Sequence, residues 1–133
     1  MCAKSKNINI NPCYPLNRIL NTARHDKITP AESKAAIRRA FKTWSDVTPL
    51  IFREVNQGFA DIYLKFGTGY HSDQYPFDGY GGTLAHAYPP MSGFGDLDGD
   101  VHFDDSEPFT VNTVDGETRF YFGWGVGGGT EYT

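Results

Sequence analysis

The segment from Gly69 to Glu107 constrains the fold of this chain more than any other part. It contains three of the four histidines in the sequence, together with a series of aspartates separated by glycines and prolines. Imidazole nitrogen suits zinc, whereas clustered carboxylates and loop carbonyls suit calcium. We therefore expect a loop-and-strand region that is organised around metal rather than around a hydrophobic core.

The zinc-ligand candidates are His71, Asp73, His86 and His102. His71 and Asp73 are two residues apart, so an extended loop points both side chains the same way. His86 and His102 each sit in a stretch of alternating polarity. A single histidine of this kind is more often an ordinary surface or packed residue, but the four side chains together favour a four-coordinate zinc site. Such a site has no open position, so it is structural rather than catalytic.

The calcium candidates centre on the glycine-rich turn Asp78–Gly82, with Asp104 and Glu107 arriving from downstream. The alternative for this turn is a plain glycine turn capped by Asp78. The run Asp96–Asp100 suggests an EF-hand because Glu107 falls at its twelfth position. Val101 stands where that loop requires glycine, however, and no helices flank it, so the EF-hand is rejected. A looser calcium loop stays open.

The composition favours one soluble-type domain with a real core. The chain has 133 residues, 39% of them hydrophobic and 15% aromatic, with a net charge of −4. The negative charge and the lack of a basic stripe argue against a nucleic-acid partner, and no apolar run is long enough to span a membrane. The first residues lack a signal peptide, which predicts an intracellular chain or an unnatural start. Cys2 and Cys13 are interpreted as two ordinary thiols.

A helix is expected from Thr29, where Thr29-Pro30-Ala31-Glu32 forms a capping box with proline at the first turn. The pattern ends near Ser45, because Pro49 disfavours helix just ahead of it. Its buried stripe is expected to be Ser33, Ile37, Ala40, Phe41 and Trp44. In 60–66, strict alternation predicts a strand with Ile62, Leu64 and Phe66 on the buried face.

Further strands are expected in 17–21, 50–55, 83–88 and 100–103, which gives an α+β layer of one sheet covered by an amphipathic helix. Residues 1–16 are unassigned, 17–119 form the domain, and 120–133 read as a glycine-rich tail. Arg119–Phe122 is apolar enough to pack, and His25 is expected to be solvated. The sequence contains no H-E-x-x-H motif, no Gly-x-Ser-x-Gly, no phosphate loop and no Cys-x-x-Cys.

Four stretches carry a family resemblance: FKTWSDVTPL at 41–50, Ala60-Asp61-Ile62, HSDQYPFDGYGGTLAHAYPP at 71–90, and DVHFDD at 100–105. Residues 17–119 resemble the N-terminal part of the matrix metalloproteinase (matrixin, metzincin) catalytic domain. The resemblance implies a secreted zinc metalloendopeptidase of the extracellular matrix. It also implies a twisted, mostly parallel five-stranded sheet with one antiparallel edge strand.

By position, the resemblance implies three ligand sets and a peptide-binding edge. The structural zinc falls on His71, Asp73, His86 and His102. A calcium falls on Asp78, Gly79, Gly81, Thr83, Asp104 and Glu107, and a second calcium on Asp61 and Asp100 with carbonyls of the intervening loop. The edge strand, which binds an extended peptide by strand addition in this family, falls on Gly82, Thr83, Leu84, Ala85 and His86.

The sequence departs from the family at three places. The Met91–Asp98 loop is longer and richer in aspartate, Cys13 does not match the Pro-Arg-Cys-Gly switch, and the sequence beyond Phe120 does not enter an H-E-x-x-H helix. These departures predict a truncated matrixin that cannot hydrolyse peptides. The alternative is a non-catalytic module that binds extended peptides of matrix proteins. A generic extracellular calcium-binding domain explains the aspartates but not the three histidines.

Overall fold

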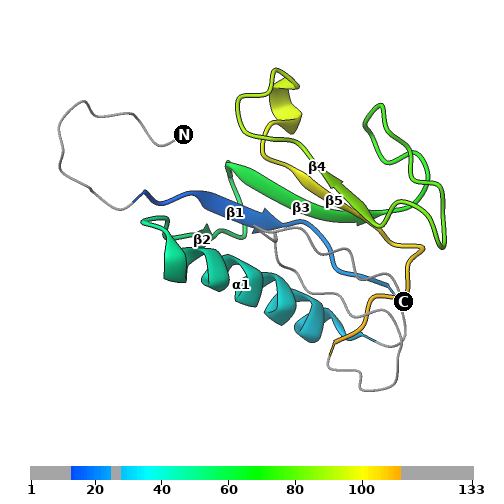
Figure 1. The fold of residues 1–133 in the computed structure, drawn as a ribbon, viewed down its shortest axis with the longest axis horizontal. Helices are drawn as coiled ribbons and strands as arrows, with labels where there is room; N and C mark the ends of the chain where they lie inside the picture. The colour runs from blue at the N-terminus through cyan, green and yellow to red at the C-terminus, as the bar shows by residue number, and fades with distance from the viewer. Residues whose placement is uncertain (1–12, 25–27, 112–133) are drawn as a thin grey trace.

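The fold is a five-stranded sheet with one long helix along one face (Figure 1). The computed structural model describes residues 13–24 and 28–111. The sheet has the order β2-β1-β3-β5-β4. Its strands are β1 (Leu16–Ile19), β2 (Arg53–Glu54), β3 (Ile62–Gly67), β4 (Ala85–Ala87) and β5 (Val101–Asp104). Neighbouring strands are parallel except for the edge strand β4, which is antiparallel to β5. The expected α+β class and sheet topology are confirmed.

The helix α1 (Pro30–Val47) begins where the capping box predicts. The Thr29 hydroxyl accepts from the Glu32 amide at 3.2 Å, and the Glu32 carboxylate accepts from the Thr29 amide at 2.8 Å. Ser33 and Ile37 are fully buried as expected. The predicted stripe omits Ala36, which is buried, and includes Ala40, which is only partly buried. The helix therefore buries the face of its first half most completely.

The hydrophobic core lies between α1 and the sheet. Leu64 and Phe66 alternate on β3 and are each 4% exposed, whereas Ile62 is only partly buried against them. The Phe66 ring stacks on Phe103 of β5 at a centroid distance of 4.9 Å and meets Phe109 edge to face at 5.4 Å. The core thus fixes β3 and β5, the two strands next to the histidine-bearing edge.

The expected strand at 50–55 is shorter in the structure. Only Arg53–Glu54 forms β2, and Leu50 makes an isolated bridge with Cys13. Backbone partners are present along this run, because the amides of Ile51, Arg53 and Val55 donate to the carbonyls of Cys13, Pro15 and Asn17 at 2.8–2.9 Å. Pro15 has no N–H group to donate in return, so the ladder is interrupted between the Cys13–Leu50 bridge and β2.

Cys13 corrects one prediction. It is disulfide-bonded, so the interpretation as an ordinary thiol is wrong at this position, while Cys2 lies outside the described residues. The expectations for His25, for Arg119–Phe122 and for the glycine-rich tail also fall outside them. None of the helices in 13–24 and 28–111 has the length and apolar character that a membrane crossing needs.

Candidate metal centre

The register of the β4–β5 hairpin brings two of the candidate metal ligands together. His86 pairs directly with His102 across the two antiparallel strands, so their imidazoles come from neighbouring positions on one sheet face. His71 and Asp73 come from the loop after β3. Four donor atoms, one from each of these residues, lie within 4.8 Å of one another. No other group of three or more His, Cys, Asp or Glu donors is this tight in the described part of the chain.

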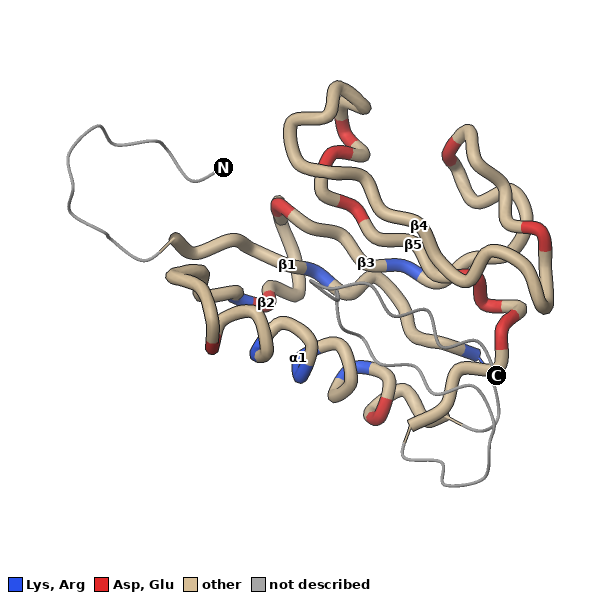
Figure 2. The backbone as a smooth tube through the Cα atoms, in the orientation of Figure 1, with Lys and Arg blue, Asp and Glu red and all other residues tan. Residues whose placement is uncertain are grey.

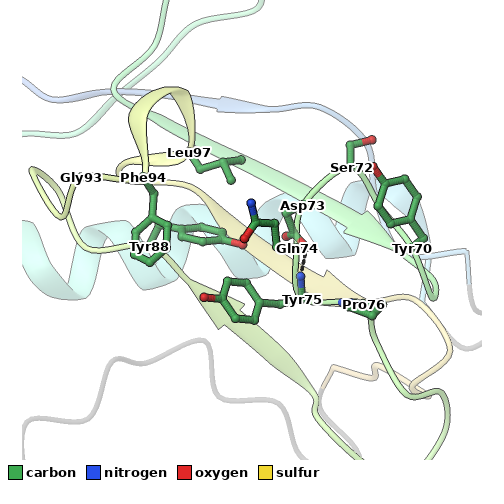
Figure 3. Close-up of a pocket in the computed structure, with 10 residues that line it drawn as sticks. All are labelled: Tyr70, Ser72, Asp73, Gln74, Tyr75, Pro76, Tyr88, Gly93, Phe94 and Leu97. Atoms are coloured by element: carbon green, nitrogen blue, oxygen red, sulfur yellow. Dashed lines mark hydrogen bonds between the residues drawn. The ribbon is translucent and has the colours of Figure 1, made fainter.

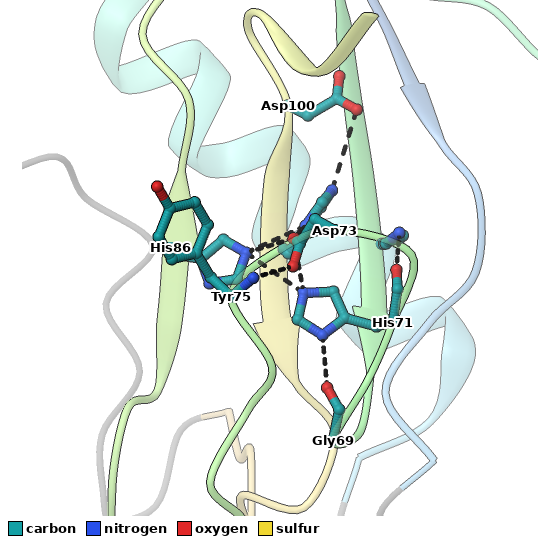
Figure 4. A network of polar contacts seen from close by, with 8 residues as sticks. Gly69, His71, Asp73, Tyr75, His86 and Asp100 are labelled. Atoms are coloured by element: carbon teal, nitrogen blue, oxygen red, sulfur yellow. Dashed lines mark hydrogen bonds and ion pairs between the residues drawn. The ribbon is translucent and has the colours of Figure 1, made fainter. Parts of the chain in front are cut away.

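The donor atoms of His71, Asp73, His86 and His102, here called the zinc quartet after the metal expected from the sequence, lie close together (Figure 4). Asp73 Oδ2 lies 2.9 Å from His71 Nε2, 2.9 Å from His86 Nε2 and 2.7 Å from His102 Nδ1. His86 Nε2 in turn lies 3.2 Å from His71 Nε2 and 3.1 Å from His102 Nδ1. Around a tetrahedral zinc ion, ligand atoms are separated by about 3.3 Å, given bonds of about 2.0–2.1 Å. The observed separations are close to that value.

The donor chemistry also fits zinc. Hydrogen bonds alone do not satisfy the polar atoms of this cluster well. Three imidazole nitrogens lie beside the same carboxylate oxygen, Asp73 Oδ2, and the nitrogen of His86 also faces those of His71 and His102. A single cation uses the lone pairs of all four groups at once. His71 is prepared for this role, since its Nδ1 lies 2.8 Å from the Gly69 carbonyl. Nδ1–H donates a hydrogen bond to that carbonyl, so Nε2 carries no proton and its lone pair faces the other three donors.

Burial and the local hydrogen bonds shift the pKa values of His86 and Asp73. Burial lowers the pKa of His86, which favours the neutral imidazole that binds metal. For Asp73, burial would raise the pKa, but hydrogen bonds from the Tyr75 amide, then from the Tyr88 hydroxyl, and then from the His86 and His102 rings hold the pKa well below its usual range. The carboxylate is therefore ionised, and the imidazole of His86 is neutral, at physiological pH.

Several residues around the quartet escaped the sequence analysis. The Phe77 ring stacks on His71 at a centroid distance of 4.2 Å and on His86 at 4.8 Å. The Lys65 ammonium donates to the His71 carbonyl and so attaches the metal loop to β3. The ring of Tyr88, directly after β4, lies edge to face with those of His86 and His102, each at a centroid distance of 5.6 Å. Only the alternation of β3, which turns Lys65 away from the core face, offers a sequence signal for any of these roles.

The first calcium set gathers at the turn after Phe77. The Asp104 and Glu107 carboxylates are buried and accept from the Gly79 and Gly81 amides at 3.2 and 2.7 Å. Asp78 accepts from the Thr83 amide at 2.8 Å. Gly79 and Gly81 both adopt φ near +86°, at 87° and 85°, a conformation that favours glycine. Buried carboxylates beside a glycine loop suit a hard cation, although they do not converge as the zinc quartet does.

The second calcium set lies at the other end of β3 and β5. Asp61 accepts from the Leu16 amide at 2.8 Å, and Asp100 from the Tyr63 amide at 3.2 Å. Gly99 packs so closely that a Cβ there would lie 2.4 Å from the Asp61 carbonyl oxygen. Asp61 and Asp100 therefore lie near each other at the starts of β3 and β5, where Gly99 packs against the Asp61 backbone. Each carboxylate accepts a hydrogen bond from a backbone amide.

The predicted peptide-binding edge is exposed along its length. Gly82, Thr83, Leu84 and Ala85 are all exposed, and β4 is the last strand of the sheet. The Leu84 carbonyl accepts from Asp104, and the Tyr88 amide donates to Asp100. Because antiparallel partners alternate, the amide and carbonyl groups of Ala85 and Ala87 point away from β5. Thr83 differs, since its amide is already bonded to Asp78.

The fold and the centre together define an α+β domain whose edge hairpin and preceding loop bring together four side chains that could hold a metal ion. The family model described as matrixin matches residues 16–122, and the chain belongs to the matrixin family, a family of metalloendopeptidases. It is 50% identical to interstitial collagenase of Bos taurus over 98 residues, 53% to stromelysin-2 of Rattus norvegicus over 83, and 52% to 72 kDa type IV collagenase of Gallus gallus over 84.

These matches cover 71%, 62% and 63% of this chain but only 20%, 17% and 12% of the three relatives. The chain therefore spans a small part of the length of the proteins that it matches.

Proposed function

We propose that this chain is the metal-stabilised sheet portion of a matrixin zinc metalloendopeptidase, with one structural zinc held by His71, Asp73, His86 and His102. The observation that supports this proposal most directly is that five donor–donor separations among these four side chains lie between 2.7 and 3.2 Å, with all four donor atoms within 4.8 Å of one another. When bound, zinc supplies a crosslink between the metal loop and the β4–β5 hairpin. Four protein ligands leave no position for water, so this zinc is not the catalytic one.

We also propose that the 133-residue chain on its own does not hydrolyse peptide bonds. Catalytic zinc needs three protein ligands, an open position and a carboxylate that accepts a proton from the bound water. The sequence has four histidines, and three of them belong to the quartet. Only His25 remains, and no H-E-x-x-H motif is present in the 133 residues.

The purified chain, loaded with zinc and calcium, tests this directly on a fluorogenic peptide that matrixins cleave broadly. We expect no turnover above buffer, with or without a metal chelator. Turnover that a chelator abolishes would overturn the proposed inactivity. An active matrixin assayed on the same plate controls for the substrate.

A second function rests on the exposed β4 edge: the chain binds an extended peptide by adding it as a further strand. The outward amide and carbonyl groups of Ala85 and Ala87 support this, because unpaired edge groups pair readily with another chain. Two of the relatives are named collagenases. We propose that the peptides come from extracellular matrix proteins and that the chain works outside the cell, where the Cys13 disulfide is stable.

Titration calorimetry with a gelatin-derived peptide tests strand addition. The matched control is the same peptide with N-methylated backbone amides at alternate residues, since N-methylation removes the donors that a new strand needs. We expect heat with the unmodified peptide and none with the methylated one. Equal heats, or no heat with either peptide at millimolar concentration, would contradict the second function.

A further inference from the structure

Two carboxylates lie on opposite sides of the His102 ring. Asp73 Oδ2 is 2.7 Å from Nδ1, the nitrogen that faces the rest of the zinc quartet, and Asp100 Oδ2 is 3.9 Å from Nε2 on the other side. Figure 4 shows Asp100 at one end of this network of contacts. Asp100 stands directly before β5 and two residues ahead of His102, so an extended chain turns both side chains to the same face of the sheet.

The three imidazoles of the quartet differ in what their outer nitrogen meets, which is the nitrogen that faces away from the other donors. That of His71 lies 2.8 Å from the Gly69 carbonyl. The side chain of His86 is 21% exposed, so water reaches its ring. The side chain of His102 is only 1% exposed, and among the described residues the polar group beside its Nε2 is the Asp100 carboxylate.

The cavity beside the quartet does not give the outer nitrogen of His102 access to water. This cavity of about 610 Å³ is lined by Asp73 and its neighbours in 70–76 (Figure 3). The opposite side is formed by Tyr88 and by residues of the loop that contains the short helix η1 (Gly95–Leu97). None of the quartet histidines is among its lining residues, so His102 Nε2 depends on Asp100 for a polar partner.

The charge of the Asp100 carboxylate is available for this contact. Its Oδ1 accepts from the Tyr63 amide at 3.2 Å, whereas its Oδ2 forms no hydrogen bond with a described residue. The sequence has no Lys or Arg between Lys65 and Arg119, and Figure 2 shows red segments but no blue ones after β3 along the described chain. Asp100 is 8% exposed, so water screens its charge only weakly.

The two carboxylates favour opposite tautomers of His102. A proton on Nδ1 would be bonded to Asp73 but would leave no lone pair for a metal at that nitrogen, whereas a proton on Nε2 leaves the Nδ1 lone pair free. With the proton on Nδ1, the Nε2 lone pair would face the Asp100 carboxylate in a buried place, which is unfavourable. The charge of Asp100 therefore stabilises the tautomer that binds metal relative to the one that does not.

We propose that Asp100 is a positioning residue for the zinc, which keeps the proton of His102 on Nε2 and so raises the affinity of the quartet for the metal. This inference rests on the proposed structural zinc site. Carboxylates next to the outer N–H of a metal-binding histidine fix its tautomer and increase its basicity. The 3.9 Å separation exceeds a hydrogen-bond length of about 2.7–3.2 Å, so Asp100 acts here through its charge.

This role is compatible with the place of Asp100 in the second calcium set. A carboxylate has two oxygens with about four lone-pair sites, so one side chain serves a calcium ion and His102 together. Asp100 then connects the zinc quartet to the second calcium set through a single residue, which no other member of that set does, because Asp61 forms no printed contact with His102.

Zinc affinity, measured by competition with a chromogenic chelator on the full chain in saturating calcium, tests the proposal. Asp100→Asn keeps an oxygen that accepts from the Tyr63 amide but removes the charge beside His102 Nε2. We expect it to weaken zinc binding about 10- to 100-fold. Asp96→Asn removes the same charge from an exposed position and should leave zinc affinity within about twofold of the unmodified chain.

Asp61→Asn separates a direct effect of Asp100 from an effect through the second calcium. It removes a charge from the same calcium set without touching His102, so we expect a much smaller loss of zinc affinity than in Asp100→Asn. NMR of the zinc-loaded chains adds a readout that a merely structural role does not move. The His102 Nε2–H signal should shift in Asp100→Asn and stay in place in Asp61→Asn.

The outcomes distinguish this inference from the proposed zinc site itself. An unmodified chain that binds no zinc would remove both. If the unmodified chain binds zinc but Asp100→Asn binds it equally tightly, only the role of Asp100 is wrong. The same conclusion follows if Asp61→Asn weakens zinc binding as much as Asp100→Asn, or if the His102 Nε2–H signal is the same in all three chains.

Discussion

Replacing Phe77 with alanine should destabilise the metal centre without removing a ligand. Phe77 is 6% exposed and stacks on two of the quartet imidazoles, at 4.2 Å on His71 and 4.8 Å on His86. Truncating a buried phenylalanine to alanine costs about 3–5 kcal/mol, through lost burial and the cavity left behind. That cost includes two ring contacts of about 0.5–1.5 kcal/mol each. Against a typical total stability of about 5–15 kcal/mol, the loss is large.

Urea unfolding followed by circular dichroism, in saturating zinc and calcium, measures this cost. We expect Phe77→Ala to lower the free energy of unfolding by about 4 kcal/mol, and Phe77→Leu, which keeps most of the apolar volume, by about 1 kcal/mol. A chromogenic chelator should also remove zinc faster from the alanine variant, because both imidazoles lose their cover. A loss under about 1 kcal/mol for Phe77→Ala would refute the packing role.

Three further changes test other parts of the structure. Ser72 has φ of +77°, so Ser72→Gly should raise the stability by about 1 kcal/mol, seen as a higher melting temperature, and a lower one would contradict the strain. Gly99 has φ of +96° and its added Cβ would lie 2.4 Å from the Asp61 carbonyl oxygen, so Gly99→Ala should destabilise by more than about 1 kcal/mol, and an unchanged melting temperature would refute the close contact. The hydrogen bond from Arg38 lowers the pKa of the Glu54 carboxylate from its usual value, so the stability from this pair is present above the unfolded-state pKa and is lost as the pH falls through the folded-state pKa; NMR titration of Arg38→Ala should show a higher Glu54 pKa.

Sequence patterns predicted the structure correctly where the interactions join residues that are close in the sequence. The capping box at Thr29 fixed the start of α1, because both of its hydrogen bonds join residues three apart. The alternation in 60–66 identified Leu64 and Phe66 as core residues, since a strand turns alternate side chains to one face. The spacing of His71 and Asp73 predicted that both side chains reach one point, but the extended loop assumed for it is wrong, because Ser72 between them has φ of +77°.

Long-range features could not be read in the same way. Nothing near Phe77 in the sequence indicates that its ring lies between two imidazoles, since one of them comes from β4. The cavity beside the quartet depends on how the Met91–Asp98 loop folds back toward residues 70–76. The disulfide of Cys13 was missed because two cysteines in a polar N-terminal segment carry no pairing signal. In each case tertiary contacts decide the outcome.

X-ray absorption at the zinc edge of the purified chain tests the central claim most directly, together with elemental analysis of the same sample. We expect one zinc per chain with three nitrogen ligands and one oxygen ligand at about 2.0–2.1 Å and no bound water. In His86→Ala we expect loss of the zinc or a change in its ligand shell. Calcium without zinc, or a zinc with fewer than three imidazole ligands in the unmodified chain, would contradict the His71, Asp73, His86 and His102 site.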